Sequence, residues 1–226
     1  MTSQADATAA AAGAAATVYG PSILERLRRH GLSPRKSLGQ NFLIEPAIAD
    51  RIVAAAELAP NDIVLEIGPG PGMLTERLAA AAAWVVADEI DGAMVALLHA
   101  ELGSLANLTI VQADILQSAP GALAAQGGAG PYKVVANLPY YITSPVLRHL
   151  LEAKRPPRLA VLMVQREVAE RICAQPNDMS ILAVSVQYYA RPTLLFHVPA
   201  AAFHPRPSVE SSVLRLEVLP SPSVAG

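Results

Sequence analysis

Residues 63–89 read IVLEIGPGPGMLTERLAAAAAWVVADE, which predicts a strand, a glycine-rich turn, a helix and a second strand in that order. The apolar runs at 63–68 and 84–88 are short and contain β-branched residues, as buried strands do. The alanine-rich segment at 75–83 between them favours a helix. Because strand–helix–strand connections are right-handed and short, we expect the two strands to be parallel neighbours in one sheet.

The alternation of strand and helix continues on both sides of this unit. Further helices are expected at 23–31, 94–102, 145–153 and 166–174. Further strands are expected at 108–114, 133–140, 159–165, 181–190 and 211–219, the last two separated by a proline-rich loop. This order predicts an α/β protein with a parallel, doubly wound sheet and helices on both faces.

The composition excludes several classes of protein. The chain has 226 residues, of which 52% are hydrophobic, so it can bury a substantial core. No unbroken apolar run reaches the roughly 18 residues that a membrane-spanning helix needs. A single cysteine, Cys173, cannot form an internal disulfide, and the five histidines lack the spacing of zinc ligands. We therefore expect a cytoplasmic protein without a structural metal ion.

The ends of the chain differ in composition from its middle. Residues 1–18 are rich in alanine and lack the basic start and the apolar block of a secretory signal, so they predict a disordered leader. One domain, with a basic helix at its start, is expected at 19–219, and a short tail at 220–226.

Charge is distributed unevenly, although the net charge is only −2. Residues 45–114 contain eleven acidic and two basic residues, a net charge of −9, while the rest of the chain contains eight acidic and fifteen basic residues, a net charge of +7. Basic residues gather in two clusters, Arg26, Arg28, Arg29, Arg35 and Lys36 in the first and Arg148, Lys154, Arg155 and Arg158 in the second. Such clusters are typical either of a surface that binds a polyanion or of ordinary solvated helix faces.

The glycine-rich turn EIGPGPG at 66–72 predicts a ligand site. Gly68, Gly70 and Gly72 allow the backbone to turn sharply and to approach a ligand closely, although a glycine loop can also be only a tight turn. The dinucleotide fingerprint requires its third glycine at position 73, where this chain has Met73. The turn therefore argues against a dinucleotide, and by itself it does not distinguish another adenosine-containing ligand from a tight turn without a ligand.

Polar residues follow three further strands at the same edge of the expected sheet. Glu89 lies 21 residues beyond Gly68, the distance at which a carboxylate binds ribose hydroxyls. Asp114 ends the next strand and is expected either to accept a hydrogen bond from an adenine amino group or to be a helix cap or a surface charge. The turn NLPY at 137–140 places the Asn137 side chain and main-chain carbonyls near one point, with a tyrosine ring beside them. These groups suit a planar base that carries an amino group.

The sequence resembles the ribosomal RNA adenine dimethyltransferase family, in particular its bacterial small-subunit members. The matching motifs are SLGQNFL (37–43), EIGPGPGMLT (66–75), DEID (88–91), QADIL (112–116), NLPYYITSPVL (137–147), MVQREVAERI (163–172) and FHPRPSVESSVLRL (203–216). The resemblance implies a Rossmann-like class I methyltransferase domain that uses S-adenosyl-L-methionine to dimethylate two adjacent adenines. In that family the adenines lie in a hairpin near the 3′ end of 16S rRNA, within the small ribosomal subunit or its precursor, and the modification belongs to ribosome biogenesis.

The resemblance also implies roles for individual residues. The cofactor-binding positions of the family fall on Gln40, Asn41, Leu43, Gly68, Gly70, Glu89, Asp114 and Asn137. The positions that hold the target adenine fall on Asn137, Leu138, Pro139, Tyr140 and Phe203. Acceptors for the amine would be the Asn137 side chain and the carbonyl of either Leu138 or Pro139, and the reaction needs no metal ion.

The chain departs from the family in one respect. Family members continue after the last strand into a small helical domain that helps to engage the RNA, whereas this sequence ends at Gly226, so we expect it to contain the catalytic domain alone. Two alternatives remain open. The protein could methylate large-subunit RNA, as related antibiotic-resistance enzymes do, or it could be a ribosome-assembly factor that binds RNA with weak or lost catalysis.

Overall fold

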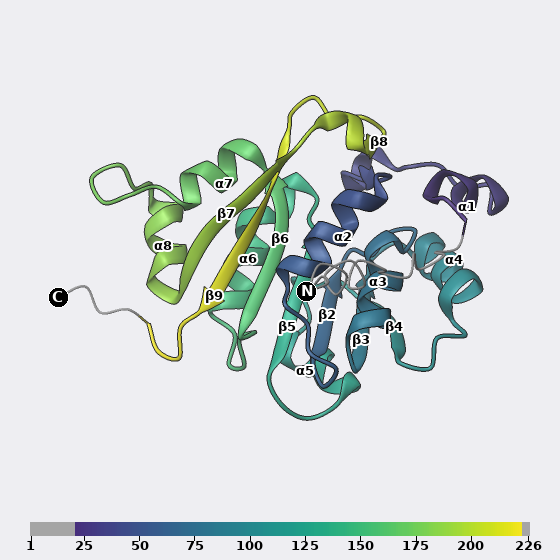
Figure 1. Ribbon diagram of the computed structural model, residues 1–226, viewed down its shortest axis with the longest axis horizontal. Helices are drawn as coiled ribbons and strands as arrows, with labels where there is room; N and C mark the ends of the chain where they lie inside the picture. The colour runs from purple at the N-terminus through teal and green to yellow at the C-terminus, as the bar shows by residue number, and fades with distance from the viewer. Residues whose placement is uncertain (1–20, 223–226) are drawn as a thin grey trace, which may run out of the picture.

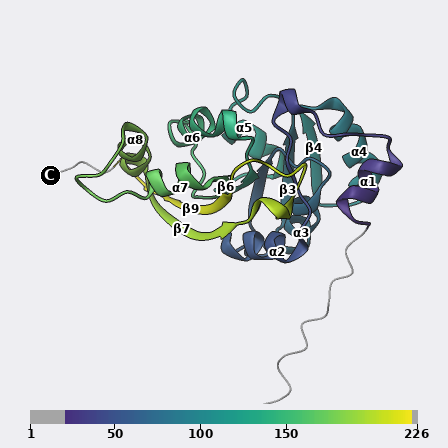
Figure 2. The ribbon, with the colours of Figure 1, turned by 90° about the horizontal axis from the view of Figure 1, so that it is seen from above.

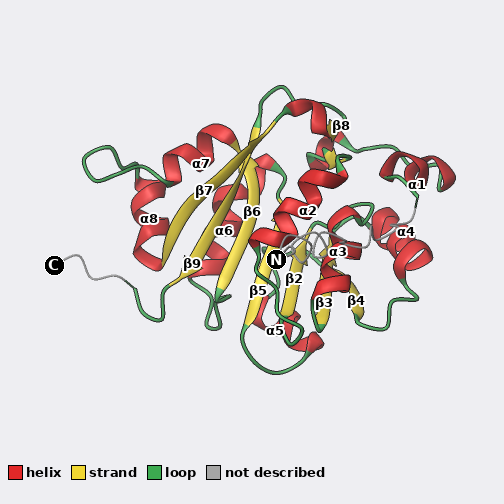
Figure 3. Ribbon diagram, in the orientation of Figure 1, coloured by secondary structure: helices red, strands yellow, loops and turns green. Residues whose placement is uncertain are grey.

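The computed structural model describes residues 21–222 of the chain. The leader predicted at 1–18 and the last residues of the predicted tail lie outside this range. A seven-stranded sheet with the order β4-β3-β2-β5-β6-β9-β7 forms the centre of the molecule, and a two-stranded sheet pairs β1 with β8 (Figures 1 and 3). The strands are β1 (Phe42–Leu43), β2 (Ile63–Ile67), β3 (Trp84–Glu89), β4 (Leu108–Gln112), β5 (Tyr132–Asn137), β6 (Leu159–Gln165), β7 (Ala190–Val198), β8 (Phe203–His204) and β9 (Ser211–Val218).

Helices cover both faces of the large sheet, as expected. The α-helices are α1 (Ile23–Arg29), α2 (Pro46–Ala55), α3 (Met73–Ala81), α4 (Gly92–Leu102), α5 (Pro120–Ala124), α6 (Thr143–Leu151), α7 (Arg166–Ile172) and α8 (Ile181–Tyr189). Short 3-10 helices are η1 (Lys36–Leu38), η2 (Ala125–Gly127), η3 (Tyr140–Ile142) and η4 (Ala200–Ala202). Figure 2 shows α2 and α3 on one side of the sheet and α5 and α6 on the other. Among residues 21–222, no helix is both long and apolar enough to span a membrane.

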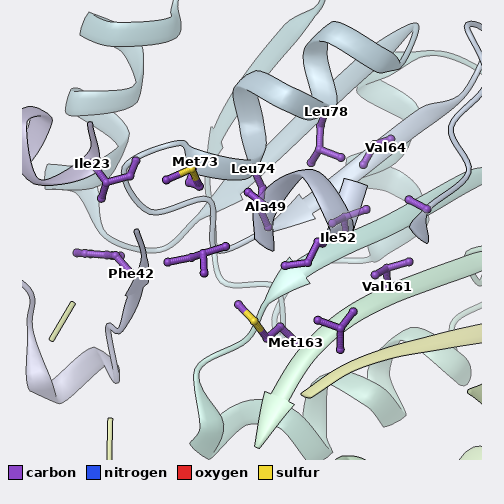
Figure 4. Packing of buried hydrophobic residues seen from close by; sticks show 14 of the residues in the cluster. Ile23, Phe42, Ala49, Ile52, Val64, Met73, Leu74, Leu78, Val161 and Met163 are labelled. Atoms are coloured by element: carbon purple, nitrogen blue, oxygen red, sulfur yellow. The ribbon is translucent and has the colours of Figure 1, made fainter. Parts of the chain in front are cut away.

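The core consists of two layers separated by the sheet. On one face Ile52, Leu74 and Leu78 from α2 and α3 pack against Val64 and Val161 of the strands (Figure 4). The other face is packed by α5 to α8 in the same manner. Each fully buried leucine or isoleucine contributes about 1.5–3 kcal/mol, so the two layers together fix the strands that carry the site.

The sheet is not wholly parallel, so that part of the prediction is wrong. Strands β4, β3, β2, β5 and β6 are parallel, but β9 pairs antiparallel with both β6 and β7. Parallel neighbours are usually joined by a crossover that contains an α-helix. The link from β7 to β9 contains only η4 and β8, and this segment instead reaches back to pair with β1.

The predicted strand at 181–190 is also wrong, because residues 181–189 form helix α8. The segment is almost continuously apolar, so its periodicity does not separate a strand from a buried helix. Ser180 caps the helix by accepting a hydrogen bond from the Ala183 N–H, and Ala183 and Val186 face the core. The strand lies at 190–198 instead, where Pro192 is tolerated because β7 is the edge of the sheet.

Candidate functional site

A pocket lies at the carboxyl ends of β2, β3, β4 and β5, the edge at which ligands bind in open α/β sheets. We call it the rim pocket. Eleven of the predicted site residues line it, namely Gln40, Asn41, Gly68, Gly70, Glu89, Asp114, Asn137, Leu138, Pro139, Tyr140 and Phe203. Leu43 does not line it. This residue is buried beside a smaller neighbouring cavity and pairs with Phe203 across the β1–β8 sheet.

The glycine turn forms the floor of the rim pocket. Gly68 and Gly70 have φ angles of +66° and +54°, which glycine adopts at little cost. A Cβ atom at Gly70 would lie 2.9 Å from the Phe42 ring, so this position also requires glycine for space. The Gly70 N–H donates to the Glu89 carboxylate at 3.0 Å, which joins the turn after β2 to the end of β3.

Glu89 ends β3 with its carboxylate largely buried. One oxygen accepts from the Gly70 N–H, and the other accepts from the Asp91 N–H at 2.9 Å. Burial raises the pKa of Glu89, and these backbone donors oppose the rise. Because a carboxylate oxygen can accept more than one hydrogen bond, Glu89 retains acceptor capacity toward the rim pocket.

Asp114 caps a turn and also lies at the rim pocket. Its Oδ1 accepts from the Leu116 N–H at 2.9 Å, so the side chain caps the turn that follows β4. The same residue lines the rim pocket, on the far side of β3 from β2. The cap fixes the orientation of the carboxylate and leaves Oδ2 as the oxygen that can meet a ligand.

Asn137 is oriented by a contact with the segment before β1. Its Nδ2 donates to the Asn41 carbonyl at 3.1 Å, across 96 positions of sequence. With the amide nitrogen engaged in this way, Oδ1 is the atom left to accept a hydrogen bond. The Pro139 carbonyl already accepts from the Ile142 N–H at 3.1 Å, at the start of η3. Since a carbonyl oxygen has two lone pairs, this bond does not exclude the Pro139 carbonyl, but it favours the Leu138 carbonyl as the second acceptor.

Two aromatic rings border this acceptor pair. The Tyr140 hydroxyl is 2.8 Å from the Ser211 hydroxyl of β9, and burial raises the pKa of Tyr140. Phe203 is 3% exposed and is placed by the β1–β8 pairing. Both rings were predicted from the sequence, but Ser211 was not. Nothing in the segment around Ser211 indicates that its hydroxyl contacts Tyr140.

Two buried carboxyl groups near the rim pocket were also missed. Burial raises the pKa of Glu66 on β2 to about 8, with a smaller contribution from Glu89 and an opposing one from Thr75. Burial likewise raises the pKa of Asp88 on β3 to about 7, and Glu89 and Asp114 add to that rise. Both residues lie within apolar strand segments of the sequence. An acid in such a segment indicates a buried carboxyl group, and this could have identified both residues.

The first basic cluster is only partly a free surface, which corrects the sequence interpretation. Arg26 is 1% exposed; it forms an ion pair with Glu76 and donates to the Pro71 carbonyl at 3.0 Å. Arg29 and Arg35 are paired with Glu101 and Asp91. Arg26 therefore attaches α1 to the glycine turn and is not available to a polyanion.

One residue of the second basic cluster, Arg158, lies far from the rim pocket. Arg158 directly precedes β6, so it lies at the amino ends of the parallel strands, and it pairs there with Asp62. Arg148 pairs with Glu152 on α6, and Arg155 donates to main-chain carbonyls. No group of three or more His, Cys, Asp or Glu residues within 21–222 is arranged to hold a metal ion.

The sequence of this chain is similar to that of known RNA-modifying enzymes. The profile of the family described as ribosomal RNA adenine dimethylase matches residues 31–224. A protein from Pelotomaculum thermopropionicum named ribosomal RNA small subunit methyltransferase A is 46% identical over 217 residues, which cover 92% of this chain and 74% of the relative. A protein of the same name from Dehalococcoides mccartyi is 44% identical over 202 residues, which cover 88% of this chain and 69% of the relative.

Solved structures show the same arrangement of the chain. The 23S rRNA methyltransferase ErmE has a TM-score of 0.72 and 32% identity, with 82% of this chain and 73% of that chain covered. A dimethyladenosine transferase from Plasmodium falciparum has a TM-score of 0.67 and 31% identity, with 77% of this chain and 62% of that chain covered. The rim pocket thus occurs in a fold shared with a protein named as an rRNA methyltransferase and with one named as a dimethyladenosine transferase.

Proposed function

This chain belongs to the ribosomal RNA adenine dimethylase family, and we propose that its substrate is the pair of adjacent adenines near the 3′ end of 16S rRNA. It is an rRNA adenine dimethyltransferase, and its methyl donor is S-adenosyl-L-methionine. We assign the catalytic domain to residues 19–219. We propose that it acts in the cytoplasm on the small ribosomal subunit or its precursor, during ribosome biogenesis. Names of the curated relatives support this choice of RNA.

The rim pocket fits an adenosyl sulfonium. Its lining, taken from the part of the chain that the structure describes, includes the acids Asp88, Glu89 and Asp114 and no lysine, arginine or histidine. In the proposed arrangement Glu89 accepts from the ribose hydroxyls and Asp114 from the adenine amino group, while Gly68 and Gly70 allow the backbone to lie close to the ligand.

The other end of the cofactor would be held by the segment before β1. Gln40 is fixed by Asp91, to which its Nε2 donates at 2.9 Å, and by the Arg35 N–H, from which its Oε1 accepts at 2.8 Å. Asn41 follows Gln40, and its carbonyl accepts the hydrogen bond from Asn137. Leu43 on β1 pairs with Phe203 on β8 and so supports it. Bound in this position, S-adenosylmethionine supplies an electrophilic methyl group that needs no further activation.

Catalysis by this chain is then mainly a matter of positioning the adenine amine. The amine nitrogen is a weak nucleophile because its lone pair is delocalised into the ring. Oδ1 of Asn137 and the Leu138 carbonyl can each accept one N–H, which favours a pyramidal nitrogen with its lone pair directed at the methyl group. The Asn41 carbonyl holds the Asn137 Nδ2, and the Ile142 N–H is bonded to the Pro139 carbonyl. The pair of acceptors that remains, Asn137 Oδ1 and the Leu138 carbonyl, is the single observation that carries the proposal.

The target base must leave the RNA stack to reach these acceptors. Unstacking costs a few kcal/mol, and stacking on Tyr140 with Phe203 nearby offsets that cost. Two exposed basic residues are near pocket-lining residues in the sequence: Lys36 precedes Gln40, and Arg206 follows Phe203. Both can contact the RNA phosphates.

The hydrogen bond between Tyr140 and Ser211 leads to a test of base positioning. We expect Ser211→Ala to lower kcat about 3- to 10-fold, because the hydroxyl bond that fixes the ring is worth about 1 kcal/mol and its loss misplaces the base. Affinity for S-adenosylmethionine should stay within about twofold. Ser212→Ala is the matched control, since Ser212 is equally buried and hydrogen-bonded but its partner is His197.

A double variant separates positioning from general destabilisation. If Ser211 acts through Tyr140, then Tyr140→Phe should lower kcat by a similar factor, and Ser211→Ala combined with Tyr140→Phe should be no worse than either alone. Ser211→Thr, which keeps the hydroxyl, should restore most of the rate. Additive losses in the double variant would contradict the assignment.

The proposed substrate is tested by mapping the product. Small-subunit particles or 16S rRNA that lack the modification are treated with the protein and S-adenosylmethionine, and primer extension locates the adenines, since dimethylation blocks base pairing. We expect stops at two adjacent adenines near the 3′ end. Stops in large-subunit RNA only would favour the alternative that the likeness to ErmE suggests. RNA binding without methyl incorporation would favour an assembly factor.

A further inference from the structure

Asp88 is a buried acid with no role in the mechanism described above. Its side chain is 2% exposed, and its Oδ1 has no hydrogen-bond partner within residues 21–222. It nevertheless lines the rim pocket. A buried polar atom without a partner is costly and rare in folded proteins, so its presence at a ligand pocket calls for an explanation in terms of the ligand.

Within residues 21–222, no lysine, arginine or histidine lines the rim pocket beside Asp88. Across the sheet its neighbours are Ile67 on β2 and Val111 on β4. The nearby ionisable groups are Glu89 on the same strand and Asp114 after β4, and both are acids. Farther along the rim, Asp91 is paired with Arg35, and Glu66 is coupled to Glu89. A cation that enters the rim pocket would therefore meet a carboxyl group that no side chain of the pocket lining compensates.

We infer that Asp88 makes the rim pocket prefer the cationic methyl donor over the neutral thioether product. This inference rests on the proposed cofactor. S-adenosylmethionine carries a sulfonium charge that S-adenosylhomocysteine lacks, and in a water-poor pocket an added carboxylate attracts the first more strongly than the second. Such a preference matters here, because successive methylations require product to leave and fresh donor to enter after every transfer.

The preference depends on pH in a defined direction. Because burial holds the pKa of Asp88 at about 7, the group is mostly neutral at pH 6 and mostly ionised at pH 8. The carboxylate that attracts the sulfonium is thus present above neutrality and lost below it. Selectivity for the donor should rise as pH increases through this range.

Equilibrium binding tests the inference without reference to activity. Isothermal titration calorimetry at pH 6 and pH 8 measures the affinity of the purified chain for S-adenosylmethionine and for S-adenosylhomocysteine. We expect the ratio of the two affinities to shift toward the donor by about 3- to 10-fold between pH 6 and pH 8 in the wild type. Asp88→Asn should greatly reduce that shift, and the small remainder reports Glu66, whose pKa of about 8 lies in the same range. Titration of the ligands' own amino groups is common to both proteins and cancels in the comparison.

Two further variants guard the conclusion. Glu217→Gln removes one negative charge from an exposed position on β9, opposite Leu159 at the amino end of β6 and so at the other edge of the sheet from the rim pocket, and should behave as the wild type. Asp88→Val is a second neutral variant in case the asparagine does not fold, as judged by circular dichroism. An affinity ratio that keeps its pH dependence in Asp88→Asn or Asp88→Val overturns this inference alone. If the wild type binds neither ligand, the proposed cofactor site is wrong and the inference fails with it.

Discussion

Asn137→Ala is expected to lower the rate of methyl transfer by about 10²- to 10³-fold, the effect of removing one preorganised hydrogen-bonding group from a reacting centre. The substitution removes the Oδ1 acceptor and leaves only the Leu138 carbonyl, so the amine loses half of the hydrogen bonding that favours a pyramidal nitrogen. Affinity for S-adenosylmethionine should change less than about threefold, because the acids on β3 and after β4 are untouched. A single-turnover assay with a labelled methyl group, beside calorimetric cofactor binding, measures both quantities.

Controls separate the loss of the acceptor from a general disturbance of the site. Asn137→Asp keeps an acceptor oxygen but cannot donate to the Asn41 carbonyl, so it should be more active than Asn137→Ala and less active than the wild type. Asn107→Ala removes an amide that bonds only main-chain carbonyls of Ala79 and Ala82, and should leave the rate unchanged. Wild-type turnover by Asn137→Ala would refute the assigned role of this residue.

The sequence was sufficient to predict the parallel half of the fold and its ligand edge. Each strand from β2 to β6 combines a short apolar run with a following turn or cap, so local propensity and burial agree. Glycine at positions 68 and 70 indicates a sharp turn, and the positive φ angles of both residues agree with this. The candidate residues after three of these strands converge because carboxyl ends of parallel strands share one edge.

The far half of the sheet could not be read in the same way. The segment at 181–190 is apolar on every side, and only packing on α6 and α7 decides that it is a helix. Strand β7 contains Pro192, which argues against a strand unless the edge position is known. Contacts across long sequence separations, such as Tyr140 with Ser211, leave no periodic signal at all.

Arg26 illustrates why charge patterns alone mislead, and it gives the largest expected effect on stability. From the sequence it is one of several arginines on a basic helix, yet its guanidinium is buried between α1, the glycine turn and α3. Arg26→Ala should lower the free energy of unfolding by about 3–5 kcal/mol, because it leaves the partly buried Glu76 without its partner and the Pro71 carbonyl without its donor. Urea denaturation followed by circular dichroism measures the change.

The neighbouring Arg28 provides the matched control, since it lies on the same helix but is exposed. Arg28→Ala should change the free energy of unfolding by less than about 0.5 kcal/mol. Because Pro71 belongs to the glycine turn, Arg26→Ala should also weaken binding of S-adenosylmethionine, whereas Arg28→Ala should not. Equal stabilities for the two variants would mean that α1 is held by its apolar residues Ile23 and Leu27 alone. A large difference would instead establish that this arginine acts inside the fold, where it links the N-terminal helix to the floor of the rim pocket.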